Sequence, residues 1–424
     1  MASRPGGDDA RRQLTVVLLA LFLVLVQFPH VLTTLTHGGP NAFDYQFPLF
    51  PSDIVLVPLI VLTAPDIVRR ARERTLSPGV AIALALVLVM AIAWIVHPSV
   101  RGVGTLLRLT GVVAGAFVLS GAKERAERRV ILGAFAIWAV LQCGFALAQR
   151  ARGHNLGLGS LGEFASPFYN FGAAKAPQGT MVHPYLLAGL AVLAGGVLTW
   201  MYVTDRHRWW VIAAAIGVAP VAFTYSRAAA VSCAILLVGV AVDAVLARER
   251  TRWLALAALT LGVVVPLAFS TAGWTKRAQD TAGNSVDTGR GHLIHQSLHV
   301  LREYPILGVG PGRYVIVLRA EHTDPRPSGG VLKPVHNVPL LAAAEGGVLA
   351  GALAVLLYVV LGWRAWRTGP LAFTVFALYV PITMLDHFAY SFPQGLAMTA
   401  VWIGVLDLAA SERLPLKRPL SARA

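Results

Sequence analysis

The residues best suited to chemistry in this sequence include two arginines that border apolar segments. Arg227 follows Ser226 in a very short connection, and Arg290 stands at the start of a helix expected over residues 288–303. An arginine at the edge of an apolar segment needs an anionic partner, because an unpaired buried guanidinium is costly. Free backbone N–H groups at a helix start also favour anions such as phosphate. The pattern predicts anion binding, with a structural carboxylate or lipid headgroups as the alternative partners.

The helix expected over 288–303 has two unlike faces. Asp287 or Thr288 can cap its start, and Tyr304–Pro305 ends it. At about 100° per residue, Arg290 shares the apolar face with Leu293, Ile294, Ser297 and Leu301. The opposite face carries His292, His295, His299 and Arg302. The three histidines have a spacing that could bind zinc, but no acidic residue falls among them, so no metal site is expected.

A histidine that could accept a proton comes just before the next long apolar stretch. His336 and Asn337 precede that stretch, and a near-neutral pKa suits His336 to act as a general base. Glu345 lies two helical turns deeper, followed by Gly346 and Gly347. Its carboxylate is expected to pair with one of the arginines or to hold a proton. A purely structural role for His336 is the alternative that residue type leaves open.

A glycine-rich run lies between the expected helix and His336. It reads Tyr-Pro-Ile-Leu-Gly-Val-Gly-Pro-Gly over residues 304–312, so that glycines stand at Gly308, Gly310 and Gly312. Glycine permits positive φ and close backbone approach, so the run is expected to fold back tightly. Another connection contributes less specific candidates for contact with sugar or phosphate, namely His154, Lys175, Thr180 and His183.

The elements that must position these residues are membrane-spanning helices. Of the 424 residues, 56% are hydrophobic and 13% are charged, about half the charged fraction of a soluble domain. Backbone polar groups inside a bilayer must be satisfied internally, which favours a helix bundle. About twelve stretches are apolar enough to span. They lie at residues 14–35, 53–68, 78–96, 105–121, 130–149, 181–203, 209–224, 228–247, 253–272, 338–362, 370–389 and 393–410.

The basic residues indicate how the bundle is oriented. The formal net charge is +15, but Lys and Arg gather in alternate connections between apolar stretches, which argues against nucleic-acid binding. The clusters lie near the N-terminus and at 69–74, 123–129, 205–208, 248–252, 364–367 and 417–418. The positive-inside rule therefore predicts that both termini are cytoplasmic and that the connections 150–179 and 273–337 lie outside.

The expected architecture is an all-α polytopic membrane protein with one domain. No Ser/Gly/Pro-rich linker divides the chain, so residues 1–424 are expected to form a single unit. Within it, residues 273–337 make one large outer loop that contains short helices. The first apolar stretch lacks a small-residue cleavage pattern and is expected to remain as a span. Cys143 and Cys233 fall inside apolar stretches and predict neither a disulfide nor a metal site.

Together these features resemble the O-antigen ligase and polymerase superfamily of bacterial membrane glycosyltransferases. The resemblance covers about residues 180–360. It rests on four short motifs in a fixed order, which are Ser226-Arg227, Arg290 at the start of an outer helix, the run over 304–310, and His336-Asn337 followed by Ala344-Glu345-Gly346-Gly347.

The resemblance implies transfer of a glycan from undecaprenyl diphosphate to an acceptor hydroxyl, without a metal or other cofactor, on the outer face of the bacterial cytoplasmic membrane. His336 would be the general base, and Arg227 and Arg290 would bind the diphosphate. Attack opposite the leaving group would invert the anomeric configuration. The supporting residues would be Ser226, Gly308, Gly310, Asn337 and Glu345. Ligases and polymerases share these motifs, so the sugar and the acceptor stay open.

A transporter or flippase of polyprenyl-linked glycans is the second hypothesis. Such proteins carry charged or Gly/Pro-broken sites near the membrane midplane, often in two related halves. In this chain the polar residues gather on one side of the predicted bundle and the halves do not repeat. The pattern therefore favours an enzyme.

Overall fold

The computed structural model describes residues 5–35, 47–163, 169–171, 174–283, 290–320 and 333–412, and these residues are mostly helical. The long elements are α1 (Pro5–Leu25), α3 (Pro51–Arg72), α4 (Pro78–Val96), α5 (Val100–Gly121), α6 (Arg125–Arg152), α7 (Pro184–Asp205), α8 (Arg208–Val218), α10 (Arg227–Ala247), α11 (Arg250–Ala268), α12 (Thr271–Gly283), α13 (Arg290–Glu303), α15 (Val338–Thr368) and α19 (Pro393–Glu412).

Short elements connect these helices. They are α9 (Val221–Thr224), α14 (Tyr314–Ala320), α16 (Pro370–Ala377), α17 (Val380–Leu385), α18 (Phe388–Ser391) and a 3-10 turn at Gly159–Leu161. Strands form two small antiparallel pairs, β1 (Thr33–Leu35) with β2 (Phe47–Leu49) and β3 (Tyr169–Phe171) with β4 (Ala174–Ala176).

The predicted all-α polytopic membrane fold is confirmed. Nine helices of the described residues are long and apolar enough to cross a membrane, and the shorter apolar stretches 208–224 and 370–385 accompany them. The predicted total of about twelve spans stays a prediction. Two predicted spans are interrupted helices, because α8 and α9 meet at Ala219–Pro220 and α16 and α17 meet at Leu378–Tyr379.

The first span differs from its predicted bounds of 14–35. Helix α1 occupies Pro5–Leu25, and the chain then leaves the helix and enters β1. Pro29 provides the physical reason for an early end, since proline has no N–H to continue a helix. The last three residues of the predicted span pair with β2 instead.

Helix α7 occupies the centre of the bundle. Its whole apolar stretch is buried, and it packs against α6, α8, α10, α16 and α19. Helix α19 lies against α5, where Gly404 faces Leu119 and Gly115 faces Ala400. Small residues at such contacts let membrane helices approach closely, which is the main source of packing energy in a lipid environment.

Ion pairs join the connections that the sequence predicts to share one side. Arg12 of α1 contacts Glu127 of α6 with an Nη2–Oε2 distance of 2.7 Å, and Arg129 of α6 contacts Asp205 of α7 with an Nε–Oδ2 distance of 2.9 Å. Further pairs are Arg11–Asp66, Arg125–Asp205, Arg128–Glu412, Arg206–Glu249, Arg252–Asp243 and Arg364–Asp407. We call this region the arginine-rich end. Its clustering confirms that these connections lie together.

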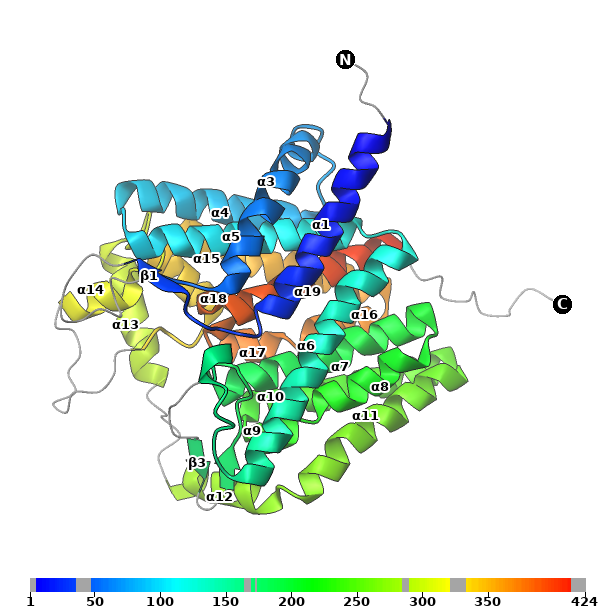
Figure 1. The fold of residues 1–424 in the computed structure, drawn as a ribbon. Coiled ribbons are helices and arrows are strands. Elements are labelled where there is room, and N and C mark those ends of the chain that lie inside the picture. Colours follow the sequence, from blue (N-terminus) through cyan, green and yellow to red (C-terminus); the bar gives the residue numbers. More distant parts are fainter. Residues whose placement is uncertain are drawn as a thin grey trace.

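The remaining connections form the other end of the bundle, the loop-rich end. Figure 1 shows α12, α13, α14 and the strand pairs gathered on the left and lower left of the helices. Helix α13 packs against α15, and α18 packs against α19. The sequence predicted short helices within 273–337 and gave bounds for one, 288–303; the described part of that segment holds most of α12 together with α13 and α14.

Candidate active site

A break in α15 receives the glycine-rich run. Gly347 has φ +79° and ψ 179°, which interrupts the helix and frees backbone groups for pairing. Three backbone hydrogen bonds join the run to the break, Val309 N–H to Ala344 C=O (3.0 Å), Gly310 N–H to Glu345 C=O (2.9 Å) and Val348 N–H to Pro305 C=O (2.8 Å). The run therefore docks on the span through its backbone, as a series of tight turns.

Glycine is required at both sides of this contact. Gly308, Gly310 and Gly312 have φ of +58°, +92° and +71°, in the region that side chains disfavour. A Cβ atom on Gly347 would collide with the backbone carbonyl of Ile306. The predicted tight fold of the run is confirmed, and the run packs against the Glu-Gly-Gly motif of α15.

Glu345 is buried beside the docked run. Its Oε2 accepts a hydrogen bond from the Tyr390 hydroxyl at 3.1 Å, and the N–H groups of Gly312 and Tyr314 also bond its side chain. These contacts tie the run, α15 and α18 together. Glu345 thus supports the geometry of the loop-rich end through a tyrosine and backbone N–H groups, whereas the sequence had suggested an arginine partner or a bound proton.

His336 lies half-buried immediately before α15. Asn337 caps the helix, because its Oδ1 accepts the Leu340 N–H at 2.9 Å. The Nδ1 atom of His336 lies 3.0 Å from the Pro334 carbonyl oxygen. A carbonyl only accepts, so Nδ1 carries the proton and Nε2 keeps its lone pair. Burial, followed by the charge of Arg290, lowers the pKa of His336, which keeps the imidazole neutral near pH 7.

Two further polar residues, Asp386 and His387, adjoin His336 and were missed by sequence reasoning. The imidazole rings of His336 and His387 meet edge to face, with centroids 5.1 Å apart, and the polar side-chain atoms of all three residues lie within 4.8 Å of one another. The Asp-His pair fell inside the predicted span 370–389. In the structure α17 ends at Leu385, which frees both residues to line the loop-rich end.

The charge states of these two residues follow from their burial. Asp386 accepts the His387 N–H at 2.7 Å, yet burial raises the pKa of its carboxyl to about 7. Burial also lowers the pKa of His387 to about 3, so that its ring stays neutral. The three residues offer ligand atoms for a metal ion, but Arg290 and Lys333 act electrostatically on the same group. These cations oppose a bound dication and favour an anion.

Helix α13 presents Arg290 half-buried at its start. Its buried residues are Leu293, Gln296, Ser297 and Val300. The predicted face was therefore partly wrong, because Ile294 is 43% exposed and the buried face is centred nearer Gln296 and Val300. Packing against α15 sets this rotation. The Asp287 and Thr288 caps lie outside the described residues. His295 and His299 are exposed, as expected for the opposite face.

Arg227 begins α10 directly after a strained turn. Ser226 caps the helix, since its Oγ accepts the Ala229 N–H at 3.3 Å. Tyr225 is fully buried in the left-handed region with φ +52°, which is unusual for a bulky residue. Its hydroxyl accepts a hydrogen bond from Arg150 Nη1 at 3.0 Å, and Gly273 provides the space for its ring. These contacts fix the position of the turn, and therefore the start of α10 at Arg227.

Helix α12 supplies a third arginine that sequence reasoning missed. Arg277 donates from Nη2 to the Tyr185 hydroxyl at 3.3 Å, and both Arg277 and Arg290 act electrostatically on Arg227. The Trp274 indole donates to the Ala222 carbonyl at 2.9 Å, which holds α12 against the turn before Arg227. The sequence did not predict a helix over 273–287. The direction of the Arg277 side chain, which depends on that helix, could therefore not be predicted.

Arg290 links the predicted base to the other predicted cation through its charge. Arg290 acts on His336 and Asp386 as well as on Arg227, and Lys333 acts on His336. Residues 212–355, which contain Arg227, Arg290 and His336, match the family model described as O-antigen ligase. This segment is similar to the O-antigen ligase family. The superfamily predicted from the motifs is thereby confirmed, and no curated protein matches the chain.

This match supports glycan transfer of the O-antigen ligase kind, with a polyprenyl-linked glycan as donor and a glycan acceptor in general terms. It favours a glycosyltransferase over the transporter hypothesis. The matched segment runs from α8 into α15. Asp386 and His387 lie beyond the matched residues, although they adjoin His336 in space.

The other candidates predicted from the sequence differ in their burial and contacts. His183 caps α7 through its Nδ1, which accepts the Tyr185 N–H at 3.1 Å, and burial lowers its pKa to about 3. Thr180 is fully buried and donates to the Gln27 carbonyl, which indicates a structural role. His154 and Lys175 are exposed. His299 lies 3.2 Å from Glu303 on the exposed side of α13.

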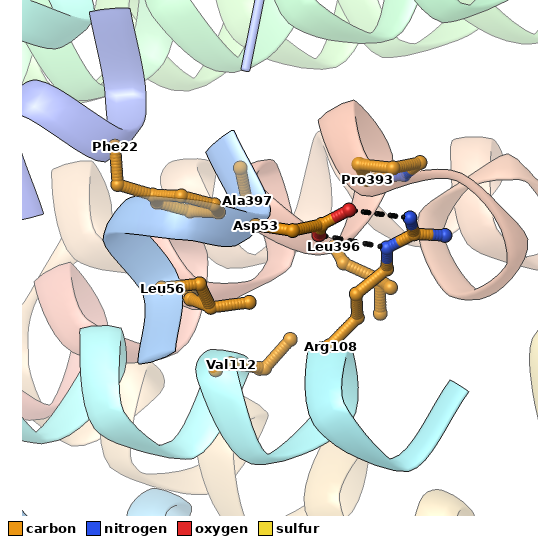
Figure 2. A pocket seen from close by; sticks show the side chains of 10 residues that line it. Phe22, Asp53, Leu56, Arg108, Val112, Pro393, Leu396 and Ala397 are labelled. Atoms are coloured by element: carbon orange, nitrogen blue, oxygen red, sulfur yellow. Dashed lines mark hydrogen bonds and ion pairs between the residues drawn. The ribbon is translucent and has the colours of Figure 1, made fainter. Parts of the chain in front are cut away.

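A separate small cavity lies between α3, α5 and α19. Figure 2 shows that Asp53 and Arg108, which both line it, are joined to each other, with an Oδ2–Nη2 distance of 2.7 Å. Arg108 also donates to the Pro48 carbonyl and stacks on Phe50. The cavity is too small for a substrate, at about 10 Å³. Its ion pair fastens the start of α3 to α5.

Proposed function

We propose that this protein transfers a glycan from a polyprenyl-diphosphate donor to an acceptor hydroxyl, with inversion at the anomeric carbon and without a metal ion. The observation that carries the proposal is the position of Arg290, whose charge acts both on a neutral His336 and on Arg227, which Arg277 acts on as well. A departing diphosphate develops negative charge, which fixed guanidinium groups stabilise through charge-assisted hydrogen bonds. A neutral imidazole beside them can accept a proton.

The proposed step balances through His336. The acceptor O–H proton moves to Nε2 while the acceptor oxygen attacks the anomeric carbon. The bond from that carbon to the diphosphate oxygen breaks, and the electron pair leaves with the diphosphate. The hydrogen bond from Nδ1 to Pro334 holds the required tautomer, since only Nε2 is then free to take the proton.

Asp386 has a supporting role in this proposal. Its polar atoms lie within 4.8 Å of those of His336 and His387, inside the field of Arg290. When His336 takes a proton, an ionised Asp386 beside the new imidazolium stabilises it.

We place this reaction on the outer face of the bacterial cytoplasmic membrane, with both chain termini in the cytoplasm and residues 1–424 acting as one domain. The support is the arginine-rich end, where the basic connections cluster as the positive-inside rule requires for a cytoplasmic side. The outer segment 273–337 then holds α13 and His336 at the site of transfer. Both the lipid donor and a glycan or glycolipid acceptor reach that face.

The decisive experiment measures release of free polyprenyl diphosphate by the purified protein in liposomes. The substrates are lipid and envelope-glycan extracts from the host, and mass spectrometry follows both the released lipid and the new glycan product. We expect release by the wild type in the presence of EDTA, and a loss of at least about 100-fold in His336→Ala, as for removal of a general base. His299→Ala is the matched control and should retain full activity.

Three outcomes would contradict the proposal. Loss of wild-type activity on chelation would point to a metal at His336, Asp386 and His387. Equal activity in His336→Ala would remove the base assignment. Movement of labelled lipid-linked glycan between leaflets without release of diphosphate would replace the transferase with a flippase.

A further inference from the structure

A second charged cavity lies at the arginine-rich end, remote in sequence from the transferase residues. It has a volume of about 390 Å³ and is walled by α1, α3, α5 and the start of α6. Five cationic side chains line it, namely Arg11, Arg12, Arg69, Arg70 and Lys123, against three acidic ones, Asp9, Asp66 and Glu127. Five positive charges less three negative charges leave a lining of +2.

The acidic residues are largely occupied by some of these cations. Asp66 pairs with Arg69 at 2.8 Å and with Arg11 at 3.5 Å, and Glu127 pairs with Arg12. Within the described ranges, no carboxylate lies within ion-pair distance of Arg70 or Lys123. Arg70 instead holds its guanidinium 5.3 Å from the centre of the Phe117 ring. The two cations of the cavity without a carboxylate partner among the described residues are both exposed.

An apolar recess adjoins the cavity along the membrane-facing side of α3. Arg69 lines both spaces, and the recess continues over Val61, Ala64, Pro65 and Val68. Val61 is 62% exposed and Val68 is 49% exposed, as suits side chains that face lipid. A cationic cavity beside a lipid-facing apolar strip matches the two parts of a phospholipid, a phosphate headgroup and its acyl chains.

We propose that this cavity binds the phosphate of an anionic phospholipid whose acyl chains lie along α3. Arg70 and Lys123 contact the phosphate, and Arg69 lies at the junction between headgroup and chains. The net charge of the lining favours an anionic over a zwitterionic headgroup. The occupant is a lipid and not a soluble phosphate ester, because Arg69 lines both the cavity and the lipid-facing recess, so a bound phosphate lies beside a surface that acyl chains cover.

The test uses native mass spectrometry and thermal unfolding of the detergent-purified full chain. The probes are phosphatidylglycerol and phosphatidylcholine with identical acyl chains. We expect the protein to retain bound phosphatidylglycerol in the mass spectrum and to unfold at a higher Tm when this lipid is added. Phosphatidylcholine should give neither effect. The double variant Arg70→Gln with Lys123→Gln should bind phosphatidylglycerol about 30-fold more weakly, since each basic residue near the headgroup contributes about a factor of five.

A matched control removes two cations from the same end but outside the cavity. Arg208, which lies 5.6 Å from the centre of the Trp209 ring, resembles Arg70 in its aromatic contact, and Arg250 is exposed. The variant Arg208→Gln with Arg250→Gln should bind phosphatidylglycerol like the wild type. Equal loss in both double variants, equal retention of both lipids, or equal protection by glycerol phosphate would overturn the proposal. The single variant Arg70→Lys keeps the positive charge, so it should fold normally and retain most of the phosphatidylglycerol binding.

Discussion

At the scale of single residues, the state of His336 depends on its neighbours. Burial and Arg290 lower its pKa from the ordinary value of 6.5, while the bond to Pro334 acts in the opposite direction. Lys333 adds a further lowering charge, and the buried rings of His183 and His387 stay neutral. A base must be unprotonated to act, so activity should rise with pH and reach half its maximum below pH 6.5.

Arg290 offers a test of this coupling. Replacing it with glutamine removes a positive charge that opposes protonation of His336, so the midpoint of the acid limb should move to higher pH by about 0.3–1 unit. Arg290→Lys retains the charge but loses the bidentate fork, so its midpoint should stay in place while the donor KM rises. Rate profiles of kcat/KM against pH for the three proteins check this. An unchanged midpoint in Arg290→Gln would show that the charge of Arg290 does not affect the pKa of the catalytic base.

At the scale of elements, the turn before α10 joins several helices at the diphosphate site. Tyr225 is bonded to Arg150 of α6, its ring packs on Gly273 and Trp274 of α12, and Arg227 follows two residues later. Tyr225→Phe keeps the ring and removes one hydrogen bond to a charged group, of about 1.5–3 kcal/mol. We expect the donor KM to rise several-fold with little change in kcat, because Arg227 and Arg277 would lose their fixed spacing.

If Tyr225 had only a structural role, Tyr225→Phe would lower stability without raising the donor KM. Tyr202→Phe, which alters a buried tyrosine at the arginine-rich end, is the matched control and should leave the donor KM unchanged. Steady-state kinetics with varied donor, together with Tm measurements, separate the two effects. A Tyr225→Phe enzyme with a lower Tm but a normal KM would contradict the positioning role.

The elements also show how far the sequence could predict this protein. Apolar length and glycine placement identified the spans, the tight run 304–312 and the helix carrying Arg290, because these depend on local chemistry. Asp386 was missed because the break after Leu385 depends on packing between distant helices. Arg277 was missed because α12 is polar and its aim is set by Trp274 and Tyr225. Tertiary contacts decided both cases.

At the scale of the whole molecule, charge separates the two ends of the bundle. The arginine-rich end pairs most of its cations with carboxylates, and the loop-rich end directs three arginines toward a site with one nearby aspartate, Asp386. The first pattern suits a cytoplasmic face, where basic connections are retained during insertion. The second suits capture of an anionic lipid donor. The proposed function therefore requires that these ends face opposite compartments.

Cysteine labelling in intact cells tests this requirement. The native Cys143 and Cys233 are buried, so they should contribute little background. His295→Cys places a thiol on the exposed side of α13, and Arg250→Cys places one at the arginine-rich end. A membrane-impermeant maleimide should label His295→Cys in intact cells, and Arg250→Cys only after the membrane is permeabilised. Labelling in the reverse order would place the arginines and His336 in the cytoplasm, where a donor lipid presented on the outer leaflet could not reach them.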